Sequence, residues 1–398
     1  MKKILLLVAI IATLLLTGCD SLKDKDIRDG FIKDIETLKS YYMEGTLKLT
    51  NNDDTYEYNV EVNYKSPDKY NVSLKNKSND YEQIILKDSE SVYVISPSIN
   101  KSFKFQSDWP NNNSQSYLLS SVAKDLKDDA AYKFTEKDGN YIFTTKTNYP
   151  NNPNYVKQNI ILDKNQKFKA IEVQDENNIT YIQFEVKTLD YKAKIDDSLF
   201  NLDEVTKDFD KTKATNEELK ENASSSEVKE KETNATETDN NLKQNESIEN
   251  NKTTTNSQNN NVTENKETKE ENENSKQKQE EASKIDENIF PLYLPTNTSL
   301  SDKEVIATND GQRVIMTFSG DNPFILVQET IKPSKALEII PTYGEPFMLV
   351  DTVGSLTETS YTWTSNGIEY YIVSDQMDKN EMLAVAKSIN VVSAINQK

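Results

Sequence analysis

Hydrophobic and polar positions follow one period near the start of the chain and another soon after it. Ile27, Phe31, Ile35, Leu38 and Tyr42 recur every three or four residues, a spacing that predicts an amphipathic helix with one apolar stripe. Such a stripe has to be covered by a second layer of structure. The pattern therefore predicts a helix over residues 27–42 that packs on a sheet.

From residue 55 the period changes to two. The stretch TYEYNVEVNYKSPDKYNVSL, residues 55–74, predicts an antiparallel hairpin that turns at the Ser-Pro-Asp triplet. Its apolar positions before the turn are Tyr56, Tyr58, Val60, Val62 and Tyr64. They lie on one face of the predicted hairpin, and acidic and amide side chains lie on the other.

Short alternating segments continue to residue 189, interrupted by a second predicted helix over residues 115–127. The predicted strands are 83–86, 91–96, 101–105, 132–135, 140–145, 155–162, 168–174 and 180–189. About ten meandering strands with one apolar face, together with two amphipathic helices, favour a strongly curved antiparallel sheet. We expect a half-open barrel wrapped around the helices.

A second folded segment is predicted over residues 285–398. FPLYLP, residues 290–295, indicates an extended entry strand, and two Gly-containing turns predict hairpins at 305–318 and 361–374. A helix is predicted from Asp378, with Glu381 in the capping-box position, to about Asn390. This segment should form a small antiparallel sheet covered by one helix, so the fold class is α+β.

The intervening residues have a different composition. Between Lys211 and Lys284 there is no aromatic residue, Gly or Pro, and such a segment cannot bury enough apolar surface to offset the entropy of ordering. We interpret residues 203–284 as a disordered linker rich in Asn, Glu, Lys and Thr. The predicted organisation is a signal peptide (1–18), a tether (19–26), the curved-sheet domain (27–202), the linker and the C-terminal domain (285–398).

The N-terminus contains the only cysteine of the chain, in LLLVAIIATLLLTGCD. The apolar run is too short to span a bilayer and follows two lysines, as in a signal peptide. Leu16, Thr17, Gly18 and Cys19 resemble the lipobox of bacterial lipoproteins, which implies cleavage before Cys19 and a covalent lipid on its sulfur. A free cysteine after an uncleaved anchor is the alternative. The resemblance predicts a protein that is lipid-anchored at the extracytoplasmic face of the cell membrane.

Composition excludes several functions. The formal net charge of −19 argues against nucleic-acid binding. The chain has no histidine and no second cysteine, so it lacks a disulfide, the usual general base and the usual zinc ligand. We therefore predict a protein that is not an enzyme, with no catalytic residue, no metal site and no cofactor other than the lipid on Cys19.

The element order carries a resemblance to a known family. A helix, a long hairpin with YKSPDKY, a central helix, then IILDKNQKFKAIEVQDENN and a closing DDSLFNL resemble the LolA/LolB/RseB-like lipoprotein domain. The resemblance implies a concave apolar cavity that holds acyl chains or a partner's peptide. The long-tethered version is similar to lipoproteins of sporulation and germination, and the C-terminal segment resembles a small domain of unknown function that follows such domains.

Candidate site residues follow from this resemblance and from the apolar pattern. Tyr58, Val60, Val62 and Tyr64 are candidates to line the cavity, with simple core packing as the alternative. Trp109, in the polar stretch SDWPNNNSQS, is a candidate gate at the rim, unless it is a loop residue that packs against the domain.

Two functions remain open. One is a binding module that captures an apolar ligand or an envelope partner protein in sporulation, germination or envelope maintenance. The other is an RseB-like sensor that regulates a membrane partner of the anti-sigma type. In both, the partners are the membrane, reached through the anchor, and an envelope protein or lipid.

Replacing the thiol tests the anchor. Cys19→Ala should abolish lipidation and release the protein from the membrane fraction while both folded segments survive, because only the attachment point is removed. Fractionation of cells, followed by proteolysis of the released protein, measures both effects. Continued membrane partitioning of the variant through an uncleaved N-terminus would rule out the lipid anchor.

Overall fold

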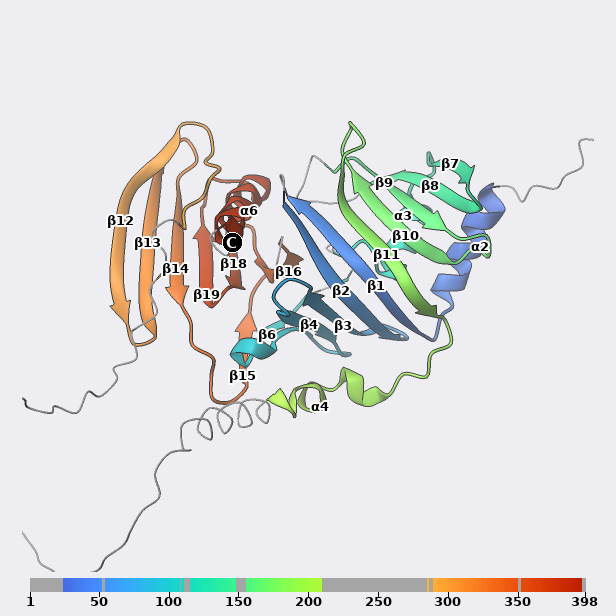
Figure 1. Cartoon of the computed structure of the whole chain (residues 1–398), viewed down its shortest axis with the longest axis horizontal. Helices are drawn as coiled ribbons and strands as arrows, with labels where there is room; N and C mark the ends of the chain where they lie inside the picture. Colours follow the sequence, from blue (N-terminus) through green and yellow to red (C-terminus); the bar gives the residue numbers. More distant parts are fainter. Residues whose placement is uncertain are drawn as a thin grey trace, which may run out of the picture. The chain divides into compact units, whose positions relative to one another are not determined.

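Two β-sheets make up most of the described chain (Figure 1). A computed structural model describes residues 24–51, 54–107, 109–110, 115–147, 155–209, 285, 289–349 and 352–395. The lipobox residues 16–19 and most of the predicted linker, residues 210–284, lie outside the described residues.

The larger sheet has 12 strands in the order β15-β6-β5-β4-β3-β2-β1-β11-β10-β9-β8-β7. Its strands are β1 (Ser40–Asn51), β2 (Asp54–Lys65), β3 (Lys69–Asn76), β4 (Glu82–Lys87), β5 (Val92–Ser96), β6 (Lys101–Phe105), β7 (Lys133–Lys137), β8 (Asn140–Lys146), β9 (Lys157–Leu162), β10 (Phe168–Gln174), β11 (Thr180–Asp190) and β15 (Glu338–Thr342). The two end strands, β15 and β7, are not neighbours in this order, so the sheet stays open, as expected for a barrel that does not close.

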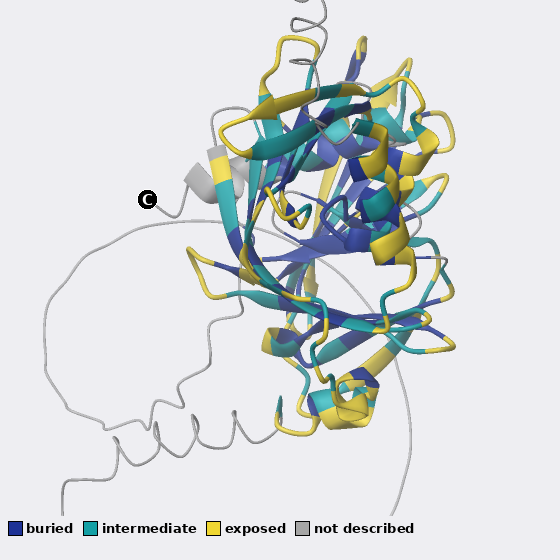
Figure 2. Cartoon of the chain, turned by 90° about the vertical axis from the view of Figure 1, so that its right-hand side faces the viewer, coloured by how far each residue is buried: buried dark blue, intermediate teal, exposed yellow. Residues whose placement is uncertain are grey.

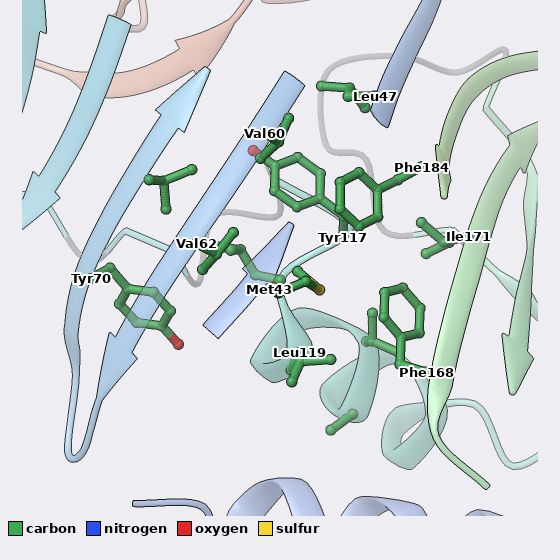
Figure 3. Packing of buried hydrophobic residues seen from close by; sticks show 14 of the residues in the cluster. Met43, Leu47, Val60, Val62, Tyr70, Tyr117, Leu119, Phe168, Ile171 and Phe184 are labelled. Atoms are coloured by element: carbon green, nitrogen blue, oxygen red, sulfur yellow. The ribbon is translucent and has the colours of Figure 1, made fainter. Parts of the chain in front are cut away.

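Two helices cover one face of this sheet, α2 (Asp24–Glu36) and α3 (Leu119–Asp128). Their apolar side chains share one core cluster with the inward residues of the strands, and Figure 3 shows Leu119 of α3 facing Met43, Val62 and Phe168. Burial of this apolar surface makes the largest favourable contribution to the free energy of folding. The described residues contain no disulfide that could add to it. Figure 2 shows buried positions along the strands and helices, with exposed positions in the loops and on the outer faces of helices and strands.

The first helix is shorter than its apolar pattern predicts. It ends at Glu36, and Tyr42 belongs to β1, where buried and half-buried residues alternate from Ser40 to Leu47. A strand periodicity therefore begins four residues after the helix ends. Leu38 and Tyr42 continue the helical spacing beyond Glu36 although neither belongs to the helix. The buried face of β1 holds Tyr41 and Met43 instead, and Tyr42 lies on the half-buried face.

Gly45 on β1 is needed for this packing. The register between β1 and β11 shifts at Glu44 and Gly45, and a Cβ at Gly45 would collide with the ring of Phe184 and the carbonyl oxygen of Glu185. The fully buried Phe184 therefore occupies space that any other residue at position 45 would fill.

The chain continues past the predicted end of the first domain. A 3-10 turn (Asp197–Phe200) leads into α4 (Leu202–Thr206). Leu202, Val205 and Phe209 then pack on a small apolar cluster of β4 and β5, made up of Ile84, Leu86, Tyr93 and Ile95. The first residues of the predicted linker thus cover part of the sheet face opposite to α2 and α3.

The smaller sheet has seven strands in the order β12-β13-β14-β19-β18-β17-β16, all antiparallel. They are β12 (Thr298–Thr308), β13 (Gly311–Gly320), β14 (Phe324–Thr330), β16 (Glu345–Met348), β17 (Val353–Leu356), β18 (Ser360–Ser365) and β19 (Ile368–Val373). Met382, Val385 and Ile389 of α6 (Lys379–Ile395) join its core. The predicted small antiparallel sheet with one covering helix is confirmed.

The structure corrects the prediction of an entirely antiparallel N-terminal sheet. β15, from the C-terminal segment, pairs with β6 in parallel, with Glu338 opposite Lys101 and Thr342 opposite Phe105. The sheet is therefore mixed. The sequence pattern could not reveal this pairing, because its two strands lie more than two hundred residues apart and alternation does not specify a distant neighbour.

A polar cluster is buried beneath the sheet. Gln158 on β9 donates from Nε2 to Oδ2 of Asp125 on α3 at 2.6 Å. Oδ1 of Asp125, Oε1 of Gln158 and Oγ1 of Thr145 are buried without a hydrogen-bond partner among the described residues. Burial raises the pKa of Asp125 to about 6, although the bond from Gln158 lowers it.

Asp125→Asn should stabilise the protein at pH 7. The pKa of Asp125 in the folded state lies above the unfolded value of 3.8. The protonated carboxyl therefore makes its full contribution to the free energy of unfolding below pH 3.8, and this contribution is lost as pH rises through about 6. A neutral amide can donate to Oε1 of Gln158 and avoids ionisation, which gives a gain of up to about 3 kcal/mol. Urea unfolding at pH 4 and pH 7 measures it.

The matched control is Asp128→Asn on the same helix, where the exposed carboxylate pairs with Lys124. This change should have little effect on the free energy of unfolding. Equal effects of the two variants at pH 7 would contradict the role assigned to burial of Asp125.

Candidate functional site

The residues predicted to line a cavity lie in the core of the larger sheet. Tyr58, Val60 and Val62 are at most 2% exposed, and Tyr64 is half-buried with its ring between those of Tyr41 and Tyr70. They pack in the apolar cluster shared with α2 and α3. The hypothesis that they also contact a ligand stays a prediction, since the core would have to open to admit one.

Trp109 is completely buried. Its ring meets Tyr70 edge-on at 5.4 Å between centroids, and its carbonyl oxygen accepts a bond from Lys87 at 2.7 Å. Of the two interpretations left open by the sequence, this burial favours a loop residue that packs into the domain. A gating role for Trp109 stays a prediction.

An apolar pocket lies elsewhere, where β15 joins β6 beside the smaller sheet. We call it the junction pocket, and its volume is about 340 Å³. One wall comes from β5, β6 and β15 and the segment after it, and the other from β17, β18 and β19. Its lining residues include Phe103, Phe105, Ile340, Tyr343, Trp363 and Tyr371. Threonine and serine side chains, among them Thr342, Thr362 and Thr364, complete the lining. A concave surface that combines aromatic and small polar side chains is typical of ligand sites.

Two tyrosines leave much of their surface exposed at this pocket. Tyr343, directly after β15, is 89% exposed, and Tyr371 on β19 is 38% exposed. Large aromatic side chains cost little conformational entropy when they bind and bury a large area. The exposure of Tyr343 therefore leaves contact area for a ligand.

One carboxylate lines the junction pocket. Burial raises the pKa of Glu369, the neighbouring carboxylate of Glu329 acts in the same direction, and Lys101 and Arg313 lower it. Arg313 donates from Nε to Oε2 of Glu329 at 2.8 Å, so its cation is already paired. Glu369 is thus an acceptor in a largely apolar site, and it favours a ligand that offers a hydrogen-bond donor beside its apolar surface.

A second polar group at the junction pocket is the indole of Trp363. Its ring stacks on Tyr370 at 4.9 Å, and its Nε1 is buried without a hydrogen-bond partner among the described residues. Among these residues no group of three or more acidic or cysteine side chains is placed to hold a metal ion.

Polar contacts fix the two walls of the pocket to each other. The buried side chain of Gln83, on β4, accepts from the backbone N–H of Val353 at 2.6 Å and from Oγ1 of Thr352 at 3.2 Å. It donates from Nε2 to the carbonyl oxygen of Val353 and to Oγ of Ser96, both at 3.3 Å. The amide of Gln83 therefore replaces a missing strand neighbour for the start of β17.

The turn before β15 is held in a similar way. Nδ2 of Asn100 donates to the carbonyl oxygen of Ser334 at 3.0 Å, and the N–H of Glu338 donates to the carbonyl oxygen of Asn100 at 2.9 Å. Asn100 adopts a left-handed conformation, with φ 53°, that asparagine tolerates better than most residues. Its backbone and its side chain thus both set the start of β15.

Sequence reasoning missed the junction pocket. β15, β16 and β17 are four or five residues long and were not predicted as strands. The available signal was the run of apolar residues around Tyr343 and Gly344, in EIIPTYGEPFM. That run has the composition of an exposed edge strand and a turn, but it does not specify which sheet the edge strand joins.

None of the described helices is long and apolar enough to cross a bilayer. No family model matches the chain. The sporulation protein YdcC of Bacillus subtilis (strain 168) is 32% identical over 387 residues, which cover 97% of the chain and 96% of that protein. This similarity confirms the relationship to sporulation proteins that the sequence predicted.

Two solved structures are similar at a much lower level. The MucA/MucB complex of Pseudomonas aeruginosa matches with 8% identity and a TM-score of 0.29, over 93% of this chain and 96% of the matched one. A LolA superfamily protein from Nitrosomonas europaea matches with 10% identity and a TM-score of 0.26, over 44% and 98%. Similarity this low does not support an inference about ligands or partners.

Removing the amide of Gln83 should loosen the junction. Gln83→Ala leaves the N–H of Val353 without its short bond, so we expect a loss of roughly 1–3 kcal/mol and faster hydrogen exchange at the start of β17. Hydrogen–deuterium exchange of peptides that contain Val353 measures the effect. Gln183→Ala, at a half-buried glutamine bonded to Glu185, is the control, and similar exchange in both variants would contradict the role of Gln83.

Proposed function

The chain belongs to the family of the sporulation protein YdcC, and on this premise we propose that it is a membrane-tethered binding protein of the sporulating cell envelope. In this proposal it captures an apolar segment of an envelope partner protein in the junction pocket. It acts by binding and catalyses no reaction. The lipid on Cys19 holds it at the extracytoplasmic face of the membrane.

One observation carries the proposal. The junction pocket has a volume of about 340 Å³ and a lining that includes five aromatic side chains, and one of these, Tyr343, is almost fully exposed. The concave face of the larger sheet, in contrast, is occupied by the side chains of α2 and α3. An apolar ligand therefore meets open contact surface at the junction pocket, whereas the face under the sheet would first have to lose its own core.

The chemistry of the lining favours a peptide over a hydrocarbon chain. Glu369 provides an acceptor and the threonine and serine hydroxyls of the lining provide donors, and an acyl chain would leave these groups without partners. A peptide segment with an apolar side chain can bond to such groups through its backbone. We therefore favour a protein partner, with an acyl chain as the alternative.

A regulatory version of this function, a sensor for a membrane partner, is favoured by one specific feature. The junction pocket takes residues from both sheets, and Gln83 on β4 joins the two through its hydrogen bond with Val353 of β17. A ligand bound there contacts both sheets at once. The binding free energy of the ligand can then change the stability of the β6–β15 pairing. A ligand-dependent change between two arrangements is what a sensor needs to pass a signal to its membrane partner.

Site-specific photo-crosslinking tests the function. A photoreactive phenylalanine at position 343 should give protein adducts in sporulating cells, and the same group at position 179 should not. Ile179 is 51% exposed in the β10–β11 turn and does not line the junction pocket. Tyr371→Asp should reduce the adduct at position 343 at least tenfold, because a second charge enters the pocket beside Glu369.

Mass analysis of the adduct separates the ligand classes. A peptide from one envelope protein supports the proposal, whereas an acyl adduct at position 343 would replace the protein partner by a lipid ligand. Equal adducts at positions 343 and 179, or an adduct at 343 that Tyr371→Asp leaves unchanged, would contradict binding in the junction pocket.

A further inference from the structure

A groove lies on the face of the larger sheet that points away from α2 and α3. It crosses β8, β9, β10 and β11, which are neighbours in the sheet (Figure 1). Its volume is about 350 Å³, similar to that of the junction pocket and within the range of small-ligand sites. We call it the outer groove.

The floor of the outer groove is apolar. The register places Ile142, Ile161 and Ala170 in one row across β8, β9 and β10. A sequence neighbour of each is fully buried in the core on the inner face, namely Phe143, Ile160 and Ile171. The three residues of the row therefore point outward. The solvated face of an antiparallel sheet is usually polar, so this aliphatic row forms a surface that can bind apolar groups.

A β-bulge on β10 directs a lysine to one end of this floor. Phe168 and Ala170 face consecutive residues of β9, so Lys169 between them has no counterpart. Bulges interrupt the regular alternation of side chains and increase the local bend of the strand. Nζ of Lys169 reaches past β9 and donates to Oδ1 of Asn140 on β8 at 3.0 Å.

This end of the outer groove is cationic. Asn140 lies opposite Lys137 in the β7–β8 hairpin, so Lys137 and Lys169 both line this end. Neither lysine forms an ion pair with a described carboxylate. Asp138, in the turn between β7 and β8, also lines the groove and offsets part of the positive charge.

The other end is acidic. Glu185 of β11 accepts from Nε2 of Gln183 at 2.9 Å. Glu172 of β10 accepts from Nδ2 of Asn159 at 3.2 Å. Both donors are neutral amides, and neither carboxylate forms an ion pair with a described lysine or arginine. Since a carboxylate can accept several hydrogen bonds, this end can bind an ammonium group.

The two ends are too far apart to neutralise each other. β8 is separated from β10 by two strand spacings and from β11 by three, so the ends lie about 10–14 Å apart across the sheet. The electrostatic screening length is about 10 Å at 0.1 M salt, so each end keeps its charge available for a ligand. An extended peptide advances about 3.3–3.6 Å per residue, so about three or four residues span this distance.

We infer that the outer groove binds a short zwitterionic peptide of about three or four residues. Its C-terminal carboxylate pairs with Lys137 and Lys169. Its N-terminal ammonium group pairs with Glu172 and Glu185. The apolar side chains between the termini lie against the aliphatic floor. A free amino acid cannot place its two charges at this spacing, and an internal segment of a protein has no free termini.

The outer groove and the junction pocket share no lining residue. They also involve opposite ends of the strand order of the larger sheet, since β8–β11 stand near the end strand β7 and β6 stands beside the end strand β15. Peptide binding in the outer groove is therefore a second binding activity, and it does not rest on the proposed function.

Calorimetric titration of residues 20–398 with the tetrapeptide Ala-Leu-Leu-Ala tests the inference. We expect saturable binding of one equivalent, and at least about tenfold weaker binding after N-acetylation or C-terminal amidation, because each modification removes one charge-assisted contact. The dipeptide Ala-Leu should also bind at least about tenfold more weakly, because it cannot reach both ends.

Variants that remove one charge assign each end. Lys169→Met should weaken binding of the free tetrapeptide about tenfold and leave the weak binding of its C-terminal amide unchanged, since that contact is already lost. Glu185→Gln should act in the same way on the free and the N-acetylated peptide. Asp138→Asn should tighten binding of the free tetrapeptide about twofold to threefold, because it removes an acid from the cationic end.

Lys187→Met is the matched control. Lys187 lies on β11, forms an ion pair with Glu44 and does not line the outer groove. Its replacement should leave the affinity for the tetrapeptide unchanged, as should Tyr371→Asp in the junction pocket.

The inference would be overturned by the absence of saturable binding, or by equal affinities for the free tetrapeptide and the peptide capped at both termini. An equal loss in Lys169→Met for the free peptide and its amide would also overturn it. Loss of binding in Tyr371→Asp with full binding in Lys169→Met would do the same, because the ligand would then lie in the junction pocket. The photo-crosslinking test of the proposed function is decided separately, by the adducts at position 343.

Discussion

The parallel pairing of β15 with β6 is the constraint on which the junction pocket depends. It makes a strand of the C-terminal segment the end strand of the N-terminal sheet, and it brings the β17–β19 edge beside Phe103 and Phe105. Five residue pairs form this ladder. The side chain of Asn100 bonds the segment before β15, and Gln83 on β4 bonds the start of β17. Because an edge strand otherwise exposes unpaired backbone groups, β15 also protects β6 from pairing with other chains. Pro341 within β15 removes one donor from the new outer edge.

The filled core of the larger sheet explains why the open surface lies at the junction. Apolar side chains of α2 and α3 cover the concave face of the sheet. Beneath them, strand residues such as Val60, Val62 and Phe184 have no exposed area. Close packing of this kind leaves no room for a ligand unless a helix moves. Open contact surface is left at the junction pocket, where strands of the larger and the smaller sheet meet and their side chains do not fill the space. Ligand sites commonly occur at such places.

Two ionisable groups stand apart from the many exposed charges of this acidic chain. Asp125 lies under the sheet and Glu369 lines the junction pocket. In each the leading cause of the pKa shift is burial, and in each the shift favours the neutral form. In its charged form, each of these groups lowers the free energy of unfolding of the protein without a ligand. A role in specifying the arrangement of the core, or in binding a ligand, would offset this cost. Asp125 is enclosed with Gln158, whereas Glu369 lines a cavity.

The sequence by itself determined the elements that depend on neighbours along the chain. The helical stripe of Ile27, Phe31 and Ile35, the hairpin around Pro67 and the capped helix after Asp378 all follow from local periodicity and turn chemistry. The family also follows from the sequence, through its 32% identity to a sporulation protein. The end of the first helix escaped this reasoning, because Leu38 and Tyr42 continue its three-to-four-residue spacing after the helix has ended at Glu36. The tertiary structure alone decided that β15 joins β6 and that Trp109 is buried. Each depends on residues distant in sequence, and alternation along a strand states which face is apolar but not which distant segment covers it.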